Sequence, residues 1–510
     1  MDRSNRTEAR RRRKAKKEKE QTRRTARQEL QRKTHAEEFR KRLKWLLPTE
    51  GIFAGLKRHG NTTWLFSTLV FLALCWAWAE NKNAVDSFTY GSEWCRTQSG
   101  ATALSTYQGM MYALEPWTEP LMKILWKVLH ERMEQIGGEF WRTDGWVPIA
   151  FDGSRDSAPR TESNEAAFCA ENHGQGKTAK YRKKKSKDMR RKNNKQNPPA
   201  APKPQVWITL MWHMGLRLPW TWRLGPSNAS ERGDVIDMLE HEEFPENTLF
   251  CGDAGFVGYP LWSAILGRGH HFLVRVGANV SLLVEQGNAV RKDNMTVLSW
   301  PESARVAGLP ALKLRLVKVK VGKTWMWMLT SVLDKDQLSV KTIRELYKQR
   351  WGIEVEFCGL KQTLDKGTLR CRTAARAKVE LHWSLMAMAV SELFALEEQL
   401  PKPHASSASL PFDASSLSDA DPQNRSLAET VRALRWSLTH LNESPESDKE
   451  SLPIKLRNAK TDDYERKSGK AARYRRSNPD KKPLGEPKIR LLNAAEKKKL
   501  KELKQNALTG

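Results

Sequence analysis

The chain has 510 residues, which exceeds one ordinary domain, so we expect two to four units. Its hydrophobic fraction of 39% excludes a chain that is well packed along its whole length. Lysine and arginine number 88 against 59 aspartates and glutamates, and the net charge of +29 favours a polyanionic partner: DNA, RNA or anionic lipid. The six cysteines are scattered and form no CxxC pair, which fits a reducing compartment.

The first 140 residues predict a basic arm followed by a small helical domain. Residues 1–45 are dominated by Arg, Lys, Glu and Gln, and we expect them to be disordered, or helical only on nucleic acid. Residues 46–140 are rich in Trp, Leu and Met, and apolar residues recur at helical spacing from Tyr107 to Ile136. The arm does not have the shape of a signal peptide.

One apolar run in this region raises the question of a membrane. Trp64 to Ala79 holds 16 residues without a charge. That length falls short of the roughly 20 residues needed to cross a bilayer. A buried helix of the N-terminal domain is the preferred interpretation, and we expect no stable membrane association.

The middle of the chain, residues 145–400, predicts a mixed α/β domain. Short strands are expected at 147–151, 206–211, 220–224 and 248–251, with a helix at 234–243. A block rich in Lys and Pro at 174–204 is interpreted as an inserted loop. Residues 271–330 predict further strands, and the pattern turns helical from Val340 to Leu400.

The C-terminal part predicts little packed structure. Residues 401–425 have the composition of a linker. Residues 426–441 predict one amphipathic helix, and the remainder up to residue 510 is interpreted as a second basic tail.

The most informative stretch carries Tyr347, Arg350, Glu354 and Lys361. On one α-helix these four side chains would fall within about 60° of one another. Arg350 and Lys361 suit a phosphodiester, the first through a bidentate fork and the second as a point charge. Tyr347 adds a phosphate hydrogen bond or a stacking surface.

The same helical arithmetic separates Glu354 from its neighbour Glu356, which would point about 200° away. A solvated helix with intrahelical ion pairs would show a similar pattern of charges. Gly352 and Gly359 also weaken the helix, by about 1 kcal/mol each if they are exposed.

A carboxylate among phosphate-binding groups implies a metal ion, because Glu354 alone would repel the phosphate. One carboxylate does not hold magnesium in a protein cage, whereas one or two partners complete a site. Asp152 follows the predicted strand VPIAF, and Asp253 follows the predicted strand TLFCG. Such strand ends line active clefts in α/β sheets, although a single Asp beside Gly is more often a turn former.

The string Y-x2-R-x3-E-x6-K, which begins at Tyr347 and contains Glu354, resembles the signature of DDE transposases of insertion-sequence family 4. Asp152 in FDGS and Asp253 in CGDAGF are similar to the first two metal-binding aspartates of that family. The resemblance covers roughly residues 145–400. The basic block at 174–204 and both ends of the chain have no counterpart in it.

The resemblance implies an RNase H-like core, with the β-rich region 271–330 inserted between the second aspartate and the glutamate. Asp152, Asp253 and Glu354 would be the catalytic residues and would bind two magnesium ions, for which manganese substitutes. One ion would activate water or a 3′ hydroxyl for in-line attack, and the other would stabilise the leaving oxygen.

The resemblance also names groups that would contact DNA. Tyr347, Arg350 and Lys361 would bind the phosphate backbone, and a flipped base would stack on Trp327 or on its neighbour Trp325. A buried structural role is the more common one for either tryptophan.

The function implied is a DNA transposase that excises and inserts its insertion sequence by hydrolysis and strand transfer at the transposon ends. Its partners would be double-stranded DNA of the ends and the target, bound as a homodimer because two ends need two active sites. The helical domain would recognise the terminal repeats, and the basic arm would add non-specific phosphate contacts. We expect a bacterial cytoplasmic protein that associates with the nucleoid.

Other interpretations stay open at this stage. A non-catalytic basic nucleic-acid-binding protein derived from a transposase would carry the same charged tails. A decayed transposase would bind the ends without cutting, and a nuclease of the same fold would use the same carboxylates without strand transfer. A membrane-anchored protein depends on residues 64–79 alone.

Overall fold

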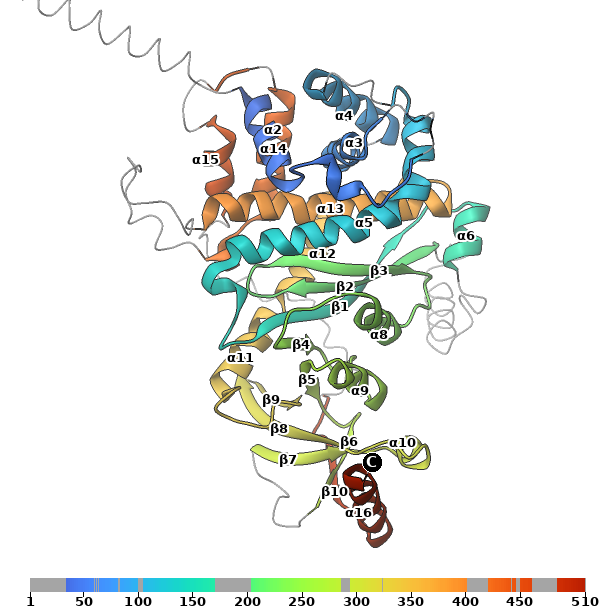
Figure 1. Ribbon diagram of the computed structural model, residues 1–510, viewed down its shortest axis with the longest axis vertical. Coiled ribbons are helices and arrows are strands. Elements are labelled where there is room, and N and C mark those ends of the chain that lie inside the picture. Colours follow the sequence, from blue (N-terminus) through green and yellow to red (C-terminus); the bar gives the residue numbers. More distant parts are fainter. Residues whose placement is uncertain are drawn as a thin grey trace, which may run out of the picture.

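The computed structural model places one large sheet beneath a layer of helices, with a smaller extension at the far end (Figure 1). It describes residues 34–169, 203–285, 294–400, 421–460 and 484–509, apart from short gaps at 59, 61, 63, 81–82, 100–103, 323, 442 and 446–449.

The strands form one ten-stranded sheet in the order β10-β6-β7-β8-β9-β5-β4-β1-β2-β3. Its strands are β1 (Val147–Ser157), β2 (Gln205–His213), β3 (Leu218–Gly225), β4 (Thr248–Gly252), β5 (His271–Val276), β6 (Ser281–Val284), β7 (Asn294–Ser299), β8 (Leu312–Val321), β9 (Thr324–Thr330) and β10 (Lys488–Leu491).

The half of the sheet around β1 contains the predicted core strands. Strands β1, β2 and β3 pair antiparallel, whereas β4 and β5 continue from β1 in parallel. Every residue of β4 is buried, as expected for a parallel strand covered on both faces. The strands predicted at 147–151, 206–211, 220–224 and 248–251 are therefore confirmed, and each is longer by one or more residues.

The other half of the sheet comes from the region 271–330. Strand β9 pairs antiparallel with both β5 and β8, and β7 lies between β8 and β6. The β structure predicted for this region is confirmed. Its first strand, β5, is a parallel neighbour of β4, and β6 to β9 extend the same sheet rather than forming a separate one.

A layer of helices from both ends of the chain covers the β3 end of the sheet (Figure 1). The long helix α13 is its centre and is buried along nearly its whole length, in contact with helices from before and after the sheet. The layer consists of α2 (His35–Leu46), the 3-10 helix η1 (Glu50–Phe53), α3 (Phe66–Trp78), α4 (Ala84–Ser99), α5 (Tyr107–Gly137), α13 (Ala374–Gln399), the 3-10 helix η5 (Pro422–Asn424), α14 (Leu427–Thr439) and α15 (Leu452–Arg457).

The apolar run at residues 64–79 forms helix α3, which packs against α4, α5 and α13 and is buried at almost every position. The interpretation as a buried helix is confirmed. Among the described residues one helix, α13, is long and apolar enough to span a membrane by length and composition, and its apolar window is buried inside the protein.

The remaining helices flank or connect the strands. They are η2 (Gly138–Trp141), α6 (Glu162–Phe168), α8 (Glu231–His241), α9 (Tyr259–Gly267), α10 (Glu302–Val306), α11 (Val340–Gln349), α12 (Gly352–Gln362) and α16 (Ala494–Thr509). Helix α8 begins three residues before its predicted start, because the Ser230 side chain accepts a hydrogen bond from the backbone of Gly233 and caps the helix there.

The predicted disordered arm is wrong for its last residues. Helix α2 occupies residues 35–46, with a capping box between Thr34 and Glu37 and with Phe39 and Leu43 buried. The basic composition of the surrounding sequence hides these two apolar positions, which lie four residues apart on one helix face. Residues 1–33 lie outside the described residues, as does most of the predicted loop at 174–204.

The predicted basic tail is also wrong in part. Residues 488–491 form β10, which pairs in parallel with β6, and α16 follows it. Helix α14 confirms the helix predicted at 426–441. Most of the predicted linker, residues 401–420, lies outside the described residues.

Candidate active site

The strand β1 supplies the first candidate ligand and two further polar side chains. Asp152, Ser154 and Asp156 alternate along the strand and therefore share one face of the sheet. Oδ1 of Asp152 accepts a hydrogen bond from the backbone N–H of Gly153 at 2.8 Å. Burial raises the pKa of Asp152, and the nearby charges of Asp253 and Glu354 add to that increase, whereas Gly153 and Arg350 oppose it.

Asp253 lies at the matching level of the neighbouring strand. Strands β1 and β4 are parallel and Ala150 pairs with Cys251, so Asp152 and Asp253 each follow that pair by two residues. Oδ1 of Asp253 accepts a hydrogen bond from the backbone of Gly255 at 2.7 Å, which closes a tight turn at the strand end. Asp253 thus follows the end of its strand, as the sequence predicted. The prediction that Asp152 also follows a strand end is wrong, because β1 continues to Ser157 and Asp152 pairs within it with Leu210 of β2.

The signature residues lie on two helices rather than on one. Helix α11 ends at Gln349 and α12 begins at Gly352, and the turn between them has 3-10 hydrogen bonds from Ile353 N to Arg350 O and from Glu354 N to Trp351 O. The single continuous helix predicted for this stretch is therefore wrong.

Gly352, the first residue of α12, packs against the sheet. A Cβ atom on this residue would lie 2.3 Å from the Trp212 ring on β2, so only glycine lets α12 approach the sheet so closely. The 3-10 turn between α11 and α12 is tight enough that Arg350, four residues before Glu354, still contacts its carboxylate.

Arg350 joins the carboxylates of the two elements. Its Nη1 lies 3.5 Å from Oδ2 of Asp152, and its Nη2 lies 3.4 Å from Oε1 of Glu354. The guanidinium is almost fully buried, and it also lies over the Tyr347 ring, 5.8 Å from the ring centre. Asp152, Arg350 and Glu354 thus form one charged group from segments about 200 residues apart in sequence.

Lys361 reaches back to β1 from the last turn of α12. Its Nζ donates a hydrogen bond to Oγ of Ser154 at 2.6 Å and lies 3.5 Å from Oδ1 of Asp156. Arg350 and Lys361 both contact side chains of β1, in agreement with the predicted convergence, but Arg350 lies in the turn before α12 and not on that helix.

Glu356 faces the opposite way, as the helical arithmetic predicted. It is buried beside Glu392 of α13, and Arg425 lies 3.4 Å from Glu392. Burial and then the neighbouring carboxylate of Glu392 hold the pKa of Glu356 well above its ordinary value. This residue belongs to the packing of α12 and not to the candidate site.

Sequence reasoning missed two acidic residues beside the site. Glu231, the first residue of α8, packs directly over Gly153: a Cβ on that glycine would lie 2.2 Å from Oε1 of Glu231. Burial and then the charges of Asp152 and Asp253 raise the pKa of Glu231. Asp156 was missed as well. The period-two alternation after Asp152 was the available signal for Asp156, but nothing in the sequence brings α8 to β1.

The two tryptophans proposed for base stacking have different environments. Trp327 is buried within β9, at 8% exposure, whereas Trp325 is 56% exposed. Lys318 Nζ lies 5.2 Å from the ring centre of Trp327 and 5.9 Å from that of Trp325. Trp327 thus takes the structural role that is usual for tryptophan, and of the two rings Trp325 is the one accessible to a base.

The three predicted ligands fit a hard cation in donor type and in charge. Asp152, Asp253 and Glu354 offer carboxylate oxygens, the donors that magnesium prefers, and Arg350 places a positive charge between two of them. Within the described part of the chain no three Asp, Glu, His or Cys side chains stand close enough together to hold a metal ion. In this conformation Asp152 and Glu354 are linked through the guanidinium of Arg350, which contacts both carboxylates.

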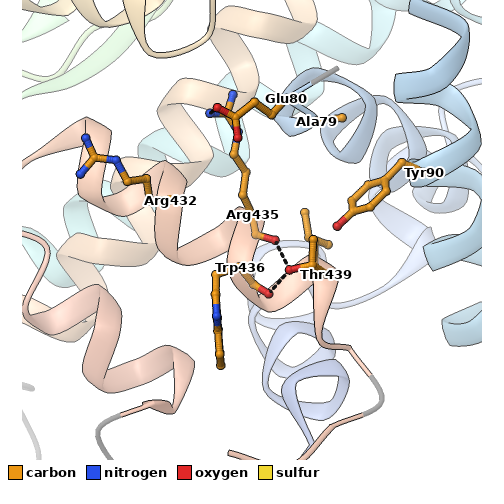
Figure 2. A pocket seen from close by; sticks show the side chains of 8 residues that line it. Ala79, Glu80, Tyr90, Arg432, Arg435, Trp436 and Thr439 are labelled. Atoms are coloured by element: carbon orange, nitrogen blue, oxygen red, sulfur yellow. Dashed lines mark hydrogen bonds and ion pairs between the residues drawn. The ribbon is translucent and has the colours of Figure 1, made fainter. Parts of the chain in front are cut away.

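The helical layer contacts the end of α12 through Arg435 of α14. Its Nε donates to the carbonyl of Trp78 at 2.6 Å, and its Nη2 donates to the carbonyl of Thr363 at 3.2 Å, just after α12. Arg435 also borders a cavity of about 350 Å³ between α3, α4 and α14, in which Thr439 bonds back to its own helix (Figure 2). None of the residues that line this cavity belongs to the candidate site.

Known proteins match the region of the chain that holds the candidate site. The family described as "Transposase DDE domain" matches residues 149–390, a span that contains Asp152, Asp253 and Glu354. The transposase InsG for insertion sequence element IS4 of Escherichia coli (strain K12) is 25% identical over 244 residues, which are 46% of this chain and 49% of the relative. The chain thus spans about half the length of the curated relative it matches.

A solved structure, the piggyBac transposase synaptic complex with hairpin DNA, is similar over 83% of this chain and 85% of that chain, at 11% identity and a TM-score of 0.36. A likeness of that size supports no argument about the site. DDE transposase domains generally use divalent metal ions, in agreement with the carboxylates described above. The region from residue 149 to residue 390 is therefore a DDE transposase domain of the kind found in insertion-sequence family 4.

Proposed function

We propose that this chain is a DNA transposase that excises and inserts its insertion sequence by metal-dependent hydrolysis and strand transfer at the transposon ends. The observation that carries the proposal is the contact of Arg350 with both Asp152 and Glu354, which unites β1 and α12 at one charged site. The family match over this region supports the same reaction class.

The strand order supports an RNase H-like core for this domain. The order β3-β2-β1-β4-β5, with the first three strands antiparallel and the last two parallel to β1, is the arrangement expected of that fold. Strands β6 to β9 lie between Asp253 and Glu354 in sequence and are the proposed insertion.

Asp152, Asp253 and Glu354 would hold two magnesium ions, for which manganese substitutes. Such ions, when bound, activate a hydroxyl nucleophile and stabilise the leaving oxygen of a phosphodiester. The cations would also favour the ionised form of Asp152, whose pKa is raised by burial and then by the charges of Asp253 and Glu354. Arg350 would then be free to turn from its carboxylate partners toward a phosphate of the DNA.

The remaining signature residues would bind the DNA backbone. Lys361 is one-third exposed and presents its ammonium on the same strand face as Asp152. Tyr347 would add a hydrogen bond or a stacking surface beside Arg350. We assign base stacking to the exposed Trp325 instead of Trp327.

The DNA partner would be double-stranded DNA of the transposon ends and of the target, bound by a homodimer. The net charge of +29 supplies the long-range attraction. We assign recognition of the terminal repeats to the N-terminal helices, which pack against α13 and so connect to the catalytic domain.

Cleavage of a labelled duplex that carries the element end tests the proposal. We expect nicking at the end in magnesium or manganese, no nicking in EDTA, and joining of the cut end to a target duplex. Binding of the end without any nicking in either metal would instead support the non-catalytic nucleic-acid-binding protein. Nicking without joining would indicate a nuclease.

A further inference from the structure

A buried carboxylate lies beneath the signature lysine. Asp156 on β1 is 1% exposed, and Nζ of Lys361 lies 3.5 Å from its Oδ1. The two oxygens of this carboxylate have no hydrogen-bond partner among the described residues. Within the described part of the chain, Lys361 therefore provides the positive charge next to Asp156. The same ammonium donates a hydrogen bond to Ser154, two residues before Asp156 on β1.

The stability of the fold does not explain this pair. Burial raises the pKa of Asp156 to about 6 although the charge of Lys361 lowers it, so burial outweighs the attraction. A carboxyl whose pKa is raised by folding destabilises the folded state when it is ionised, at every pH above its unfolded pKa. A neutral side chain of the same shape would suit the fold as well or better at neutral pH.

The geometry explains the pair through Lys361 itself. A lysine ammonium has three donors on a flexible stem, and contacts with Ser154 and Asp156 direct it toward β1. Both contacts lie on the strand face that carries Asp152. One donor remains for a phosphate next to the candidate catalytic residues, and the side chain is exposed enough to meet it.

We propose that Asp156 and Ser154 are positioning residues, which hold the Lys361 ammonium in place for a DNA phosphate at the site of cleavage. This inference rests on the proposed transposase function, because it needs a phosphate substrate beside Asp152.

The test is a double-mutant cycle in the full chain with Asp156→Asn, Lys361→Met and the double variant. We expect Asp156→Asn to lower the single-turnover cleavage rate about 10-fold at pH 7.5, with its affinity for the end unchanged or slightly tighter. In the Lys361→Met background, Asp156→Asn should have no further effect on the cleavage rate, because the ammonium that Asp156 positions is absent. Equal losses in both backgrounds, or no loss in either, would overturn the proposal.

Charge alone predicts the opposite sign. Asp156→Asn removes a negative charge, so an electrostatic role would make the variant bind DNA more tightly and cleave at least as fast. The thermal midpoint of Asp156→Asn should equal or exceed that of the wild type. A lower midpoint would show that the pair is structural and would count against positioning.

A second readout does not need cleavage. Competitive acylation of lysines in DNA-free protein, read by mass spectrometry, should label Lys361 several-fold faster in Asp156→Asn and in Ser154→Ala than in the wild type. Unchanged labelling would refute the positioning role even if the enzyme cuts DNA. If the variants label faster but the protein never cuts DNA, the contact of Asp156 and Ser154 with Lys361 would be supported, whereas the proposed transposase function would be contradicted.

The pH dependence gives a third readout. Asp156 protonates as the pH falls through about 6. The wild type then lacks the negative charge beside Lys361, as the Asp156→Asn variant does at every pH. The cleavage rates of wild type and variant should therefore converge between pH 7.5 and pH 5.5. A constant ratio across that range would contradict the proposal.

Discussion

Arg350 is the residue on which the geometry of the candidate site depends. Its buried guanidinium lies between two carboxylates that otherwise repel each other. Burial first, and then the charges of Asp253 and Glu354, raise the pKa of Asp152, and Arg350 opposes that increase. A divalent cation at Asp152 and Glu354 would provide the same compensation. Arg350 and a bound cation would therefore compensate the same negative charge, that of Asp152 and Glu354.

The variant Arg350→Ala should lower the free energy of unfolding by about 1–2 kcal/mol without divalent cation, a loss kept small because Glu354 is over a third exposed. Magnesium should restore part of this stability, because it neutralises the two carboxylates. Thermal unfolding with magnesium and with EDTA measures the effect. Arg142→Ala, whose side chain bonds only backbone carbonyls, is the control and should show no dependence on magnesium. The same loss in magnesium and in EDTA for Arg350→Ala would contradict this view of the site.

Single residues show where sequence reasoning succeeds and where it stops. The spacing of Arg350 and Glu354 predicted that the two side chains lie together, and they do so across the turn between α11 and α12, although no single helix carries both. Asp152 and Asp253 lie at the same level of neighbouring strands, but the sequence wrongly ended the first strand before Asp152. Glu231 could not be found in this way, because its position over Gly153 depends on how α8 crosses β1 in three dimensions. Periodicity along one element predicts which residues share a face, and it does not predict which elements meet.

At the scale of elements, the approach of α12 to the sheet sets the position of Glu354 and Lys361. Gly352 allows it, since the Trp212 ring occupies the space of a side chain, and at the other end of the helix Gly359 packs against Leu427 of α14. The sequence suggested that these glycines weaken the helix. Their role is instead close packing, which propensity alone cannot reveal because Trp212 and Leu427 are distant in sequence.

We expect Gly352→Ala to move α12 away from β2 and to cost about 1–3 kcal/mol of stability by overpacking. Cleavage should fall more than DNA affinity, because Glu354 shifts relative to Asp152 while the basic surface stays intact. Gly267→Ala provides the matched control, since nothing lies within 4 Å of a Cβ at that exposed helical position. Wild-type stability and cleavage in Gly352→Ala would show that the contact with Trp212 does not position the helix.

At the scale of the whole molecule, the first and the last described segments of the chain, residues 35–46 and 488–509, are built into the fold. Helix α2 joins α14 and α15 in the helical layer, and β10 with α16 completes the opposite end of the sheet (Figure 1). Composition predicted both regions as tails because lysine and arginine dominate them. Their few apolar anchors, such as Phe39 and Leu492, become visible only when the partner surfaces are known.

Glu496 fastens the C-terminal segment. It accepts hydrogen bonds from Arg490 at 2.6 and 2.7 Å and pairs with Arg305 of α10. These hydrogen bonds, those of Arg490 first, lower its pKa to about 2. A lowered acid pKa stabilises the folded state above the unfolded value near 4.5 and loses that effect as the pH falls through 2.

The variant Glu496→Gln should therefore weaken the attachment of β10 and α16 at pH 7 by about 1–2 kcal/mol, because Arg490 is half exposed and water screens its ion pair with Glu496. Hydrogen exchange in β6 and β10 should become at least 10-fold faster. In the wild type the same protection should disappear between pH 4.5 and pH 2. Glu486→Gln removes an exposed ion pair with Lys318 and should leave exchange unchanged. Equal exchange in Glu496→Gln and the wild type would show that the segment is held by other contacts.

The proposed cleavage chemistry depends on Glu354 as a catalytic carboxylate. A comparison of Glu354→Gln with Glu356→Gln tests this role most directly. Both substitutions lie on α12, but Glu356 is buried on the side of the helix away from the candidate site. Burial and Glu392 raise its pKa there and favour the neutral form, which glutamine resembles in shape. We predict that Glu354→Gln binds the element end but loses metal-dependent cleavage by at least 100-fold, while Glu356→Gln retains it. Cleavage by Glu354→Gln at the wild-type rate would contradict the assignment of this carboxylate to the active site.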